Sequence, residues 1–199
     1  MMLPGDFFDL QEYEHQELFQ PDAPVWTALD RLPTYLASFF EGTWPLINHV
    51  GMVDRPLVIV NSTVRNDLSI RPSTANNIIQ AFEGDRPVEN AAIIMPGVYL
   101  FDDKIIIGAR TVVEPGVLIK GPTVLGTDTE VRQGAYLRGD CLIGNRCVVG
   151  HTTEVKSSIM IDGSKAGHFA YIGDSILGRD VNLGAGTKLA NLRMIPGPV

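Results

Sequence analysis

Residues 117–143 read VLIKGPTVLGTDTEVRQGAYLRGDCLI, and this stretch determines the fold. A branched aliphatic residue occupies every sixth position in it, at Ile119, Leu125, Val131, Leu137 and Ile143. The position two residues before each of these holds a small or β-branched residue or cysteine. A strict six-residue period is typical of a parallel β-helix, in which each period supplies one short strand and one corner.

The period extends in both directions from this stretch. Every sixth residue from Met95 to Ile161 is apolar. Met95 and Phe101 are not branched aliphatics, so we expect a less regular entry to the helix there. Three six-residue faces close one turn of about 18 residues, and turns stack at roughly 4.8 Å. Ordinary hairpins would not keep such a period, so the sequence predicts a β-helix.

The period breaks once near the C-terminal end. Ile161 and Leu177 are 16 residues apart instead of 18, and residues 162–168 (DGSKAGH) lie between them. A shift of register in a solenoid predicts a loop or an irregular corner. Functional residues concentrate at such departures from a regular pattern.

Residues 1–90 lack the hexapeptide period, and we expect a small helical or α/β cap on the first turn. Residues 22–40 carry apolar residues at helical spacing, with Pro33 dividing two turns or two short helices. Residues 56–60 (PLVIV) predict a buried strand. Residues 73–82 (STANNIIQAF) predict a helix that begins after a serine N-cap.

Composition and charge exclude several classes of protein. A net charge of −7 disfavours a general nucleic-acid binder. No apolar run is long enough to span a bilayer, and the first residues lack the pattern of a signal peptide. We therefore expect a cytoplasmic protein without nucleic-acid or membrane partners. Cys141 and Cys147 fall at the small inward position and are predicted to be buried fillers, not reactive thiols or metal ligands.

Three cations share one position of the repeat. Lys120, Arg138 and Lys156 are each 18 residues apart, so they should stack at one corner. Like charges stacked in this way repel each other. Two interpretations remain open: an anion such as a phosphate lies between them, or each is neutralised by a local acid such as Asp140 or Glu154.

His168 is the candidate general base. It lies 12 residues after Lys156, inside the predicted irregular corner, and Tyr171, Asn182 and Asn191 follow it. Imidazole titrates near neutral pH, with a reference pKa of about 6.5, which suits acid–base catalysis.

Four segments in this region carry a resemblance to a known family. They are residues 150–156 (GHTTEVK), 163–168 (GSKAGH), 171–174 (YIGD) and 181–187 (VNLGAGT). At this spacing they resemble the acetyltransferase half of the bacterial bifunctional enzyme that makes UDP-N-acetylglucosamine, the glucosamine-1-phosphate N-acetyltransferase and N-acetylglucosamine-1-phosphate uridylyltransferase. The similarity is close from Arg138 to Asn191 and loose over the rest of the repeat.

The resemblance implies a left-handed β-helix, a homotrimer and active sites between subunits. It implies that His168 removes a proton from the amine of glucosamine 1-phosphate, which then attacks the thioester of acetyl-CoA, and that Asn191 belongs to the catalytic group. The remaining roles that it implies are phosphate binding by Arg138, Lys156 and Tyr171, orientation of the sugar by Asn182 and Asn191, and contact of the Gly184–Ala185 backbone with acetyl-CoA. Lys120 joins the substrate-binding set through its place in the cation column.

The sequence departs from the family in three respects. Residues 1–90 contain no glycine-rich nucleotide loop, so uridylyl transfer is not expected. After Asn191 the pattern is lost and the sequence stops at Val199, where family members continue with turns that hold most of coenzyme A. We expect either a truncated chain or one without the usual acyl-donor site. His151 also stands where the family has no histidine.

The sequence thus predicts an all-β fold: a left-handed parallel β-helix over residues 91–199 with a cap over residues 1–90. The favoured function is acetyl-CoA-dependent N-acetylation of an amino sugar phosphate or a nucleotide-sugar-related acceptor. The alternative is a non-catalytic trimeric module that binds a sugar phosphate. A β-helix zinc carbonic anhydrase is disfavoured, because the repeat offers only His151 and His168, and no metal is expected.

Overall fold

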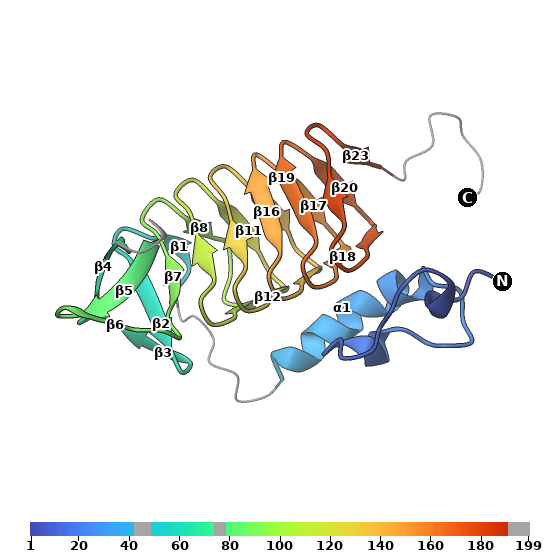
Figure 1. The fold of residues 1–199 in the computed structure, drawn as a ribbon, viewed down its shortest axis with the longest axis horizontal. Helices are drawn as coiled ribbons and strands as arrows, with labels where there is room; N and C mark the ends of the chain where they lie inside the picture. The colour runs from blue at the N-terminus through green and yellow to red at the C-terminus, as the bar shows by residue number, and fades with distance from the viewer. Residues whose placement is uncertain (42–48, 74–78, 191–199) are drawn as a thin grey trace.

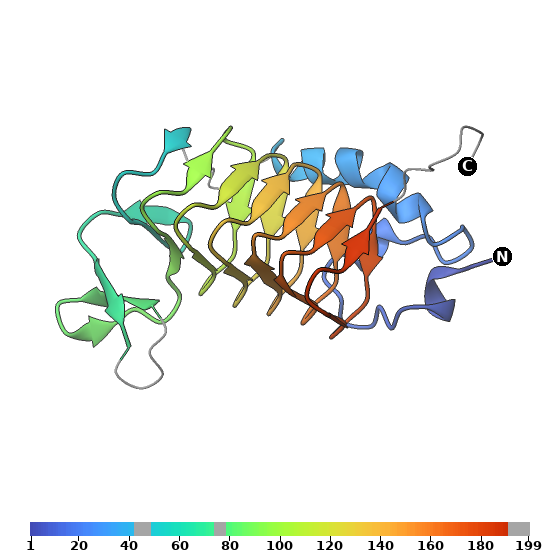
Figure 2. The same ribbon diagram turned by 90° about the horizontal axis from the view of Figure 1, so that it is seen from above.

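The computed structural model describes residues 1–41, 49–73 and 79–190. In these ranges the chain forms a parallel β-helix whose triangular turns stack along one axis (Figure 1). One α-helix runs along the side of the stack, and a small group of strands closes its N-terminal end. Viewed from above, the turns follow one another in sequence order (Figure 2). The predicted fold class is therefore confirmed.

Three parallel sheets form the sides of the prism. Sheet A contains β8 (Tyr99–Leu100), β11 (Leu118–Lys120), β14 (Tyr136–Arg138), β17 (Glu154–Lys156), β20 (Tyr171–Gly173) and β23 (Lys188–Leu189). Sheet B contains β7 (Ala92–Ile94), β10 (Val112–Val113), β13 (Glu130–Val131), β16 (Val148–His151), β19 (Lys165–His168) and β22 (Asn182–Leu183). Sheet D contains β9 (Ile105–Ile107), β12 (Thr123–Leu125), β15 (Cys141–Ile143), β18 (Ser158–Met160) and β21 (Ile176–Leu177).

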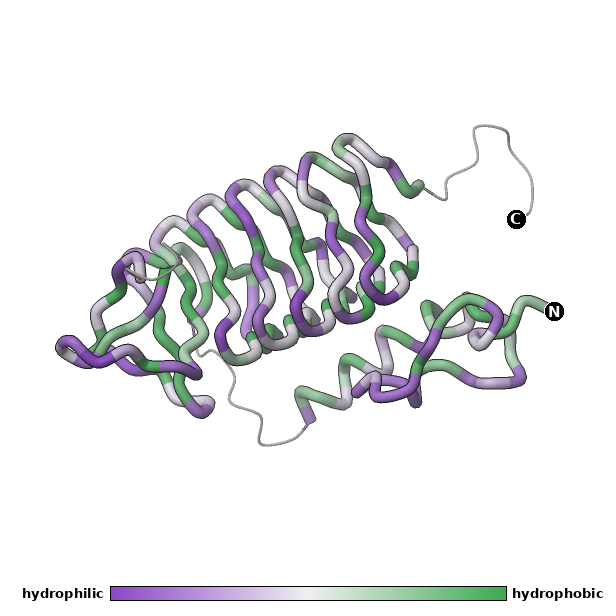
Figure 3. The backbone as a smooth tube through the Cα atoms, viewed as in Figure 1, coloured by the Kyte–Doolittle hydropathy of each residue, from purple (hydrophilic) through white to green (hydrophobic). Residues whose placement is uncertain are grey.

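The predicted aliphatic column fills the axis of the prism. From Val113 to Val155 each sixth residue is at most 1% exposed. Hydrophobic residues alternate with hydrophilic ones along the turns (Figure 3). Buried Thr111, Thr129 and Thr153 donate their hydroxyls to carbonyl oxygens of the next turn, as Thr129 Oγ1 does to Gly144 at 2.9 Å. Each hydrogen bond of this kind stabilises the stack by about 1 kcal/mol.

The two cysteines behave as the sequence predicts. Cys141 and Cys147 are both buried and free, in the inward slots of sheet D and of the corner before sheet B. Burial raises the pKa of Cys141 to about 12 and also raises the pKa of Cys147. Such thiols stay protonated and unreactive at neutral pH.

The register of the helix differs from the prediction at its two ends. At the start, Ile94 and Leu100 point inward, whereas Phe101 is 41% exposed. The loop between β8 and β9 is longer than the later corners. Leu100 therefore pairs with Ile119, 19 residues further on, and the inward position of this turn falls on Leu100 instead of Phe101. Met95 likewise packs outside the axis, against a cluster beside sheet B.

The predicted irregular corner at residues 162–168 is wrong. The two residues missing between Ile161 and Leu177 are not lost at one corner. In each of two successive turns, the corner that follows sheet A is one residue shorter. Cys141 therefore pairs with Ser158, and Ile159 with Ile176, at spacings of 17. Met160 takes the inward position, and Ile161 lies on the outer side of sheet D. Residues 165–168 form a regular strand, β19.

The N-terminal segment lies along the outer face of sheet D instead of covering the first turn. It consists of η1 (Pro4–Asp6), η2 (Gln16–Leu18) and α1 (Thr27–Phe39). Leu18, Leu32 and Leu36 pack there with Leu142 and the neighbouring aliphatic residues of the sheet. Burial of each large side chain contributes about 1.5–3 kcal/mol.

The helix predicted within residues 22–40 is confirmed over Thr27–Phe39, but its division at Pro33 is wrong. Pro33 lies inside the single continuous helix α1. Its ring removes one backbone hydrogen bond. The buried Leu32 and Leu36 on either side of it hold the helix against sheet D and offset that loss.

Strands close the N-terminal end of the prism. β1 (Gly51–Met52) pairs antiparallel with β8, and β2 (Leu57–Val60) with β7 and β3 (Thr63–Arg65). The strand predicted for residues 56–60 is therefore confirmed. Sheet C holds β4 (Ser69–Pro72), β5 (Ile79–Glu83) and β6 (Arg86–Pro87).

The helix predicted for residues 73–82 is wrong where the structure describes it. Residues 79–82 belong to strand β5, and residues 74–78 lie outside the described ranges. Tertiary contacts outweigh the local helical pattern here. Ala81 is buried beside sheet B, and the Arg71 guanidinium lies 4.0 Å from the centre of the Phe82 ring. The division of the chain at residue 90 stays a prediction.

The N-terminal segment carries one buried histidine that predicts a pH dependence. His15 is 6% exposed, and its Nδ1 lies 2.8 Å from the Tyr35 hydroxyl. Burial lowers the pKa of His15, and Glu14, Asp162 and Glu17 oppose that shift. Below about pH 6.5 the unfolded chain binds a proton there that the folded chain does not yet bind.

The free energy of unfolding should therefore fall as the pH drops below about 6.5 toward the lowered folded pKa of His15. Urea denaturation above and below that pH measures the loss. A His15→Gln variant should lose less stability over the same interval. An equal loss in both proteins would show that His15 does not cause it.

Candidate functional site

The predicted general base lies at the corner between sheets B and A. His168 ends β19 and pairs in register with His151 on the preceding turn. The backbone carbonyl of His168 accepts a hydrogen bond from Gly186 N at 3.1 Å, which places Ala185 at the same corner one turn further on. The structure therefore brings His168 next to Ala185, as the predicted roles require.

The His168 side chain is exposed to solvent. Within the described residues no hydrogen bond engages its imidazole ring. His151 differs, because its Nδ1 lies 3.0 Å from the carbonyl oxygen of Gln133. Of the two histidines, His168 is thus the one whose ring makes no hydrogen bond to the described part of the chain.

The other predicted residues near the base come from both neighbouring sheets. Tyr171 is half-buried on sheet A, one strand beyond the His168 corner. Asn182 is exposed on sheet B, in register with Lys165. Gly184 and Ala185 are exposed at the corner that follows Asn182. Asn191 lies outside the described residues, so its catalytic role stays a prediction.

The cation column forms on sheet A, and each cation has a partner within the chain. Lys120 pairs in register with Arg138, and its Nζ lies 5.1 Å from the centre of the Phe101 ring. Arg138 Nη1 donates to Glu154 Oε1 at 2.6 Å. Lys156 Nζ donates to Asp174 at 3.0 Å. The sequence names Glu154 as a possible partner but misses Asp174.

The ion pair of Arg138 with Glu154 is exposed enough for a ligand to replace the carboxylate. The side chains of Arg138 and Glu154 are 42% and 35% exposed, and an ion pair of this kind contributes only about 0–1 kcal/mol. A phosphate offers the guanidinium a stronger bidentate contact than one carboxylate oxygen does. The anion interpretation therefore stays a prediction that requires displacement of Glu154.

The candidate residues extend across sheet A from the corner between sheets B and A: Arg138 and Lys156 end β14 and β17, at the opposite end of sheet A from His168. Arg138, Lys156 and Tyr171 lie on sheet A, His168 at the corner, and Asn182 on sheet B. Their side chains occupy two outward faces, so one copy of the chain does not enclose a ligand between them. Sheet D cannot contribute to the site, because the N-terminal segment covers it.

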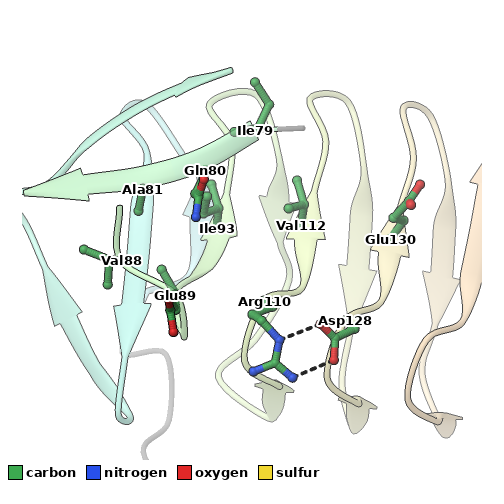
Figure 4. A pocket seen from close by; sticks show the side chains of 11 residues that line it. Ile79, Gln80, Ala81, Val88, Glu89, Ile93, Arg110, Val112, Asp128 and Glu130 are labelled. Carbon is green, nitrogen blue, oxygen red and sulfur yellow. Dashed lines mark hydrogen bonds and ion pairs between the residues drawn. The ribbon is translucent and has the colours of Figure 1, made fainter. Parts of the chain in front are cut away.

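A separate groove lies between β5 and sheet B (Figure 4). Arg110 lies at its edge, and two dashed lines join its guanidinium to Asp128. A third hydrogen bond joins Arg110 to Asn90 at 3.0 Å. This arginine is fully paired, and Glu89 and Glu130 also line the groove. The negative charge of the groove therefore disfavours a phosphate. None of the predicted site residues lines it.

Two further observations bear on the class of protein. In the described parts of the chain, no group of three or more His, Cys, Asp or Glu side chains is placed to hold a metal ion. The same parts contain no helix of the length and apolarity that crossing a membrane requires.

The stacked turns, each built from three repeats of about six residues, define a hexapeptide-repeat parallel β-helix protein. Residues 121–197 match the GMPPB C-terminal domain family. The "Bifunctional protein GlmU" of Enterococcus faecalis is 31% identical over 154 residues, which are 60% of this chain and 33% of that protein. The protein of the same name from Thermodesulfovibrio yellowstonii is 39% identical over 113 residues, 55% of this chain and 24% of its own length.

A "Bifunctional sugar-1-phosphate nucleotidylyltransferase/acetyltransferase" of Sulfurisphaera tokodaii is 53% identical over 45 residues, or 23% of this chain and 11% of that protein. These matches confirm the resemblance that the sequence predicts. The chain spans about a third or less of the length of the relatives named here.

Proposed function

We propose that this protein transfers an acetyl group from acetyl-CoA to the amine of an amino sugar phosphate. One observation carries the proposal: His168, with its ring open, lies at the same corner as Ala185 and between the faces that hold Tyr171 and Asn182. The similarity to bifunctional proteins, one of which is named an acetyltransferase, supports the same chemistry.

The chemistry needs one base and close placement of two reactants. The amine nitrogen of the sugar attacks the thioester carbonyl carbon, and His168 takes the proton from that nitrogen. The carbon–sulfur bond then breaks, and the leaving thiolate of the coenzyme takes the proton from His168 to become the thiol. Placement of the two reactants supplies much of the rate, and the base adds about 10²–10⁴-fold. The exposed Gly184–Ala185 backbone is the proposed contact for acetyl-CoA.

A homotrimer would complete the site. The proposed residues cover two outward faces of the prism, whereas the third face is covered by the chain itself. A neighbouring copy packed beside the corner between sheets B and A would turn the exposed residues into a cleft. This arrangement supports active sites between subunits, because residues of the two faces would then enclose one ligand.

The phosphate is proposed to bind at Arg138 and Lys156. An Arg138→Gln variant should bind glucosamine 1-phosphate about tenfold more weakly, because one charge-assisted contact is lost. The matched control is Arg110→Gln, which removes an arginine that is also ion-paired and exposed but lies on another corner. Isothermal titration measures both affinities. Equal affinities in the two variants would contradict a phosphate site at Arg138.

A thiol-release assay tests the proposed function. Purified protein is mixed with acetyl-CoA and, in turn, with a panel of amino sugar phosphates and nucleotide sugars. Thiol released in proportion to an amino sugar phosphate supports the proposal. Binding of a sugar phosphate with no thiol release would instead support the non-catalytic alternative, a trimeric module that binds the sugar phosphate.

A further inference from the structure

Two residues of the corner between sheets B and A, Thr152 and Phe169, stand where the other turns have glycine. Six turns place a residue with positive φ at this corner: Gly97 (90°), Gly116 (79°), Gly134 (75°), Thr152 (51°), Phe169 (35°) and Gly186 (76°). Glycine is the residue that adopts this backbone without steric cost. A phenylalanine there is an outlier, because its side chain offers no local hydrogen bond to support the left-handed conformation.

Phe169 is also unusual in being exposed. Its side chain is 57% exposed, although a phenylalanine normally lies in a core. The backbone conformation and the exposure are both unfavourable for folding, so packing of the β-helix does not account for the residue. Backbone outliers of this kind concentrate at functional sites.

The ring of Phe169 lies beside the candidate base. It follows His168 directly, and its edge faces Gly186 on the next turn, where a Cβ would meet Phe169 Cε2 at 3.1 Å. The glycine therefore leaves room for the ring on one side. The rest of the residue is largely open to solvent, since Phe169 is 57% exposed.

We propose that Phe169 is an aromatic platform on which the sugar ring of the acceptor stacks beside His168. The inference rests on the proposed function and specifies how the acceptor is held. The electron-rich face of a phenyl ring attracts the C–H bonds on the apolar face of a pyranose ring. Stacking there would keep the amine close to the base while Arg138 and Lys156 hold the phosphate.

The surroundings favour a ligand over a second copy of the chain as the partner of this ring. The core of a subunit interface gathers several large apolar side chains. Along the corner the neighbours of Phe169 are His168, the exposed His151 and Thr152 of the preceding turn, and the small residues Ala185 and Gly186 of the next turn. This mixture of one aromatic ring with polar and small groups suits a polyol with one apolar face.

Three variants test the platform. Phe169→Gly removes the ring and relieves the backbone, Phe169→Trp keeps an aromatic face, and Thr152→Gly relieves the equivalent position one turn earlier. Affinity for glucosamine 1-phosphate is measured by titration, the melting temperature by calorimetry, and kcat and KM by thiol release. Size-exclusion chromatography with light scattering gives the oligomeric state.

We expect Phe169→Gly to bind glucosamine 1-phosphate about fivefold to tenfold more weakly and to raise KM by a similar factor with kcat little changed. The melting temperatures of Phe169→Gly and Thr152→Gly should both equal or exceed that of the wild type. The affinity of Thr152→Gly for glucosamine 1-phosphate should not change. Phe169→Trp should bind within about threefold of the wild type.

Unchanged affinity in Phe169→Gly overturns the inference and leaves the proposed function standing. A changed oligomeric state in that variant also overturns it and assigns the ring to a subunit contact. A wild-type protein that neither binds nor acetylates the sugar phosphate overturns the proposed function and the inference together.

Discussion

Replacing His168 by alanine is expected to lower kcat for acetyl transfer by about 10²–10⁴-fold, because the amine loses the group that takes its proton. The side chain is exposed, so the fold and the oligomeric state should not change. Affinity for glucosamine 1-phosphate should stay close to that of the wild type. Steady-state kinetics by thiol release, together with circular dichroism and light scattering, measure these quantities.

His151 provides a matched control for this variant. It is exposed at the same corner one turn earlier and pairs in register with His168. Because its Nδ1 already lies at hydrogen-bonding distance from the carbonyl oxygen of Gln133, it has no proposed role in the reaction. His151→Ala should keep most of the activity. Full activity in His168→Ala, or equal losses in both variants, would show that the base is another residue.

Replacing Gly150 by alanine is expected to destabilise the protein by about 3 kcal/mol. A Cβ on Gly150 would overlap the carbonyl group of Gly167 on the next turn. Both partners are backbone, so no side chain can move to make room, and the two turns that carry His151 and His168 would separate. Urea denaturation measures the change in the free energy of unfolding.

Gly167 is the matched control for Gly150. It lies in the same column one turn further on, but a Cβ there would meet no atom within 4 Å. Gly167→Ala should therefore change the stability by less than about 0.5 kcal/mol. Similar losses in the two variants would contradict the close approach of these turns at Gly150.

The period of the inward aliphatic residues made the β-helix predictable. Each face of the prism needs one large apolar residue in the axis, so such residues recur at a regular spacing in the sequence. From Val113 to Val155 this periodic pattern agrees with the structure. The same periodicity predicted that Lys120 and Arg138 lie side by side. Stacking at a fixed spacing is a property of the backbone, so it can be deduced without knowing any side-chain contact.

The position of the register shift could not be deduced from spacing alone. A total deficit of two residues between Ile161 and Leu177 is compatible with one irregular corner or with two shortened ones. Ile161 is apolar like Met160, which is the residue that points inward, so hydropathy did not distinguish them. The prediction that Ile161 points into the axis was therefore wrong, although the β-helix continues beyond it.

The segments outside the repeat were harder to predict because tertiary contacts decide their structure. Residues 79–82 read as part of a helix, yet they form β5 against β4. The N-terminal helix was expected on the first turn but lies on sheet D, whose outward aliphatic residues gave no distinct signal. The importance of Phe169 was equally hidden, since only the φ angles of the column show that it replaces a glycine.

The proposed reaction is N-acetylation of an amino sugar phosphate at the corner that carries His168. Incubation of the protein with acetyl-CoA labelled in the acetyl group and with glucosamine 1-phosphate, followed by NMR of the products, tests this claim. We predict that the label appears in an amide on the sugar nitrogen and that His168→Ala prevents its formation. Glucosamine 1-phosphate that binds the protein but stays unacetylated would contradict the claim.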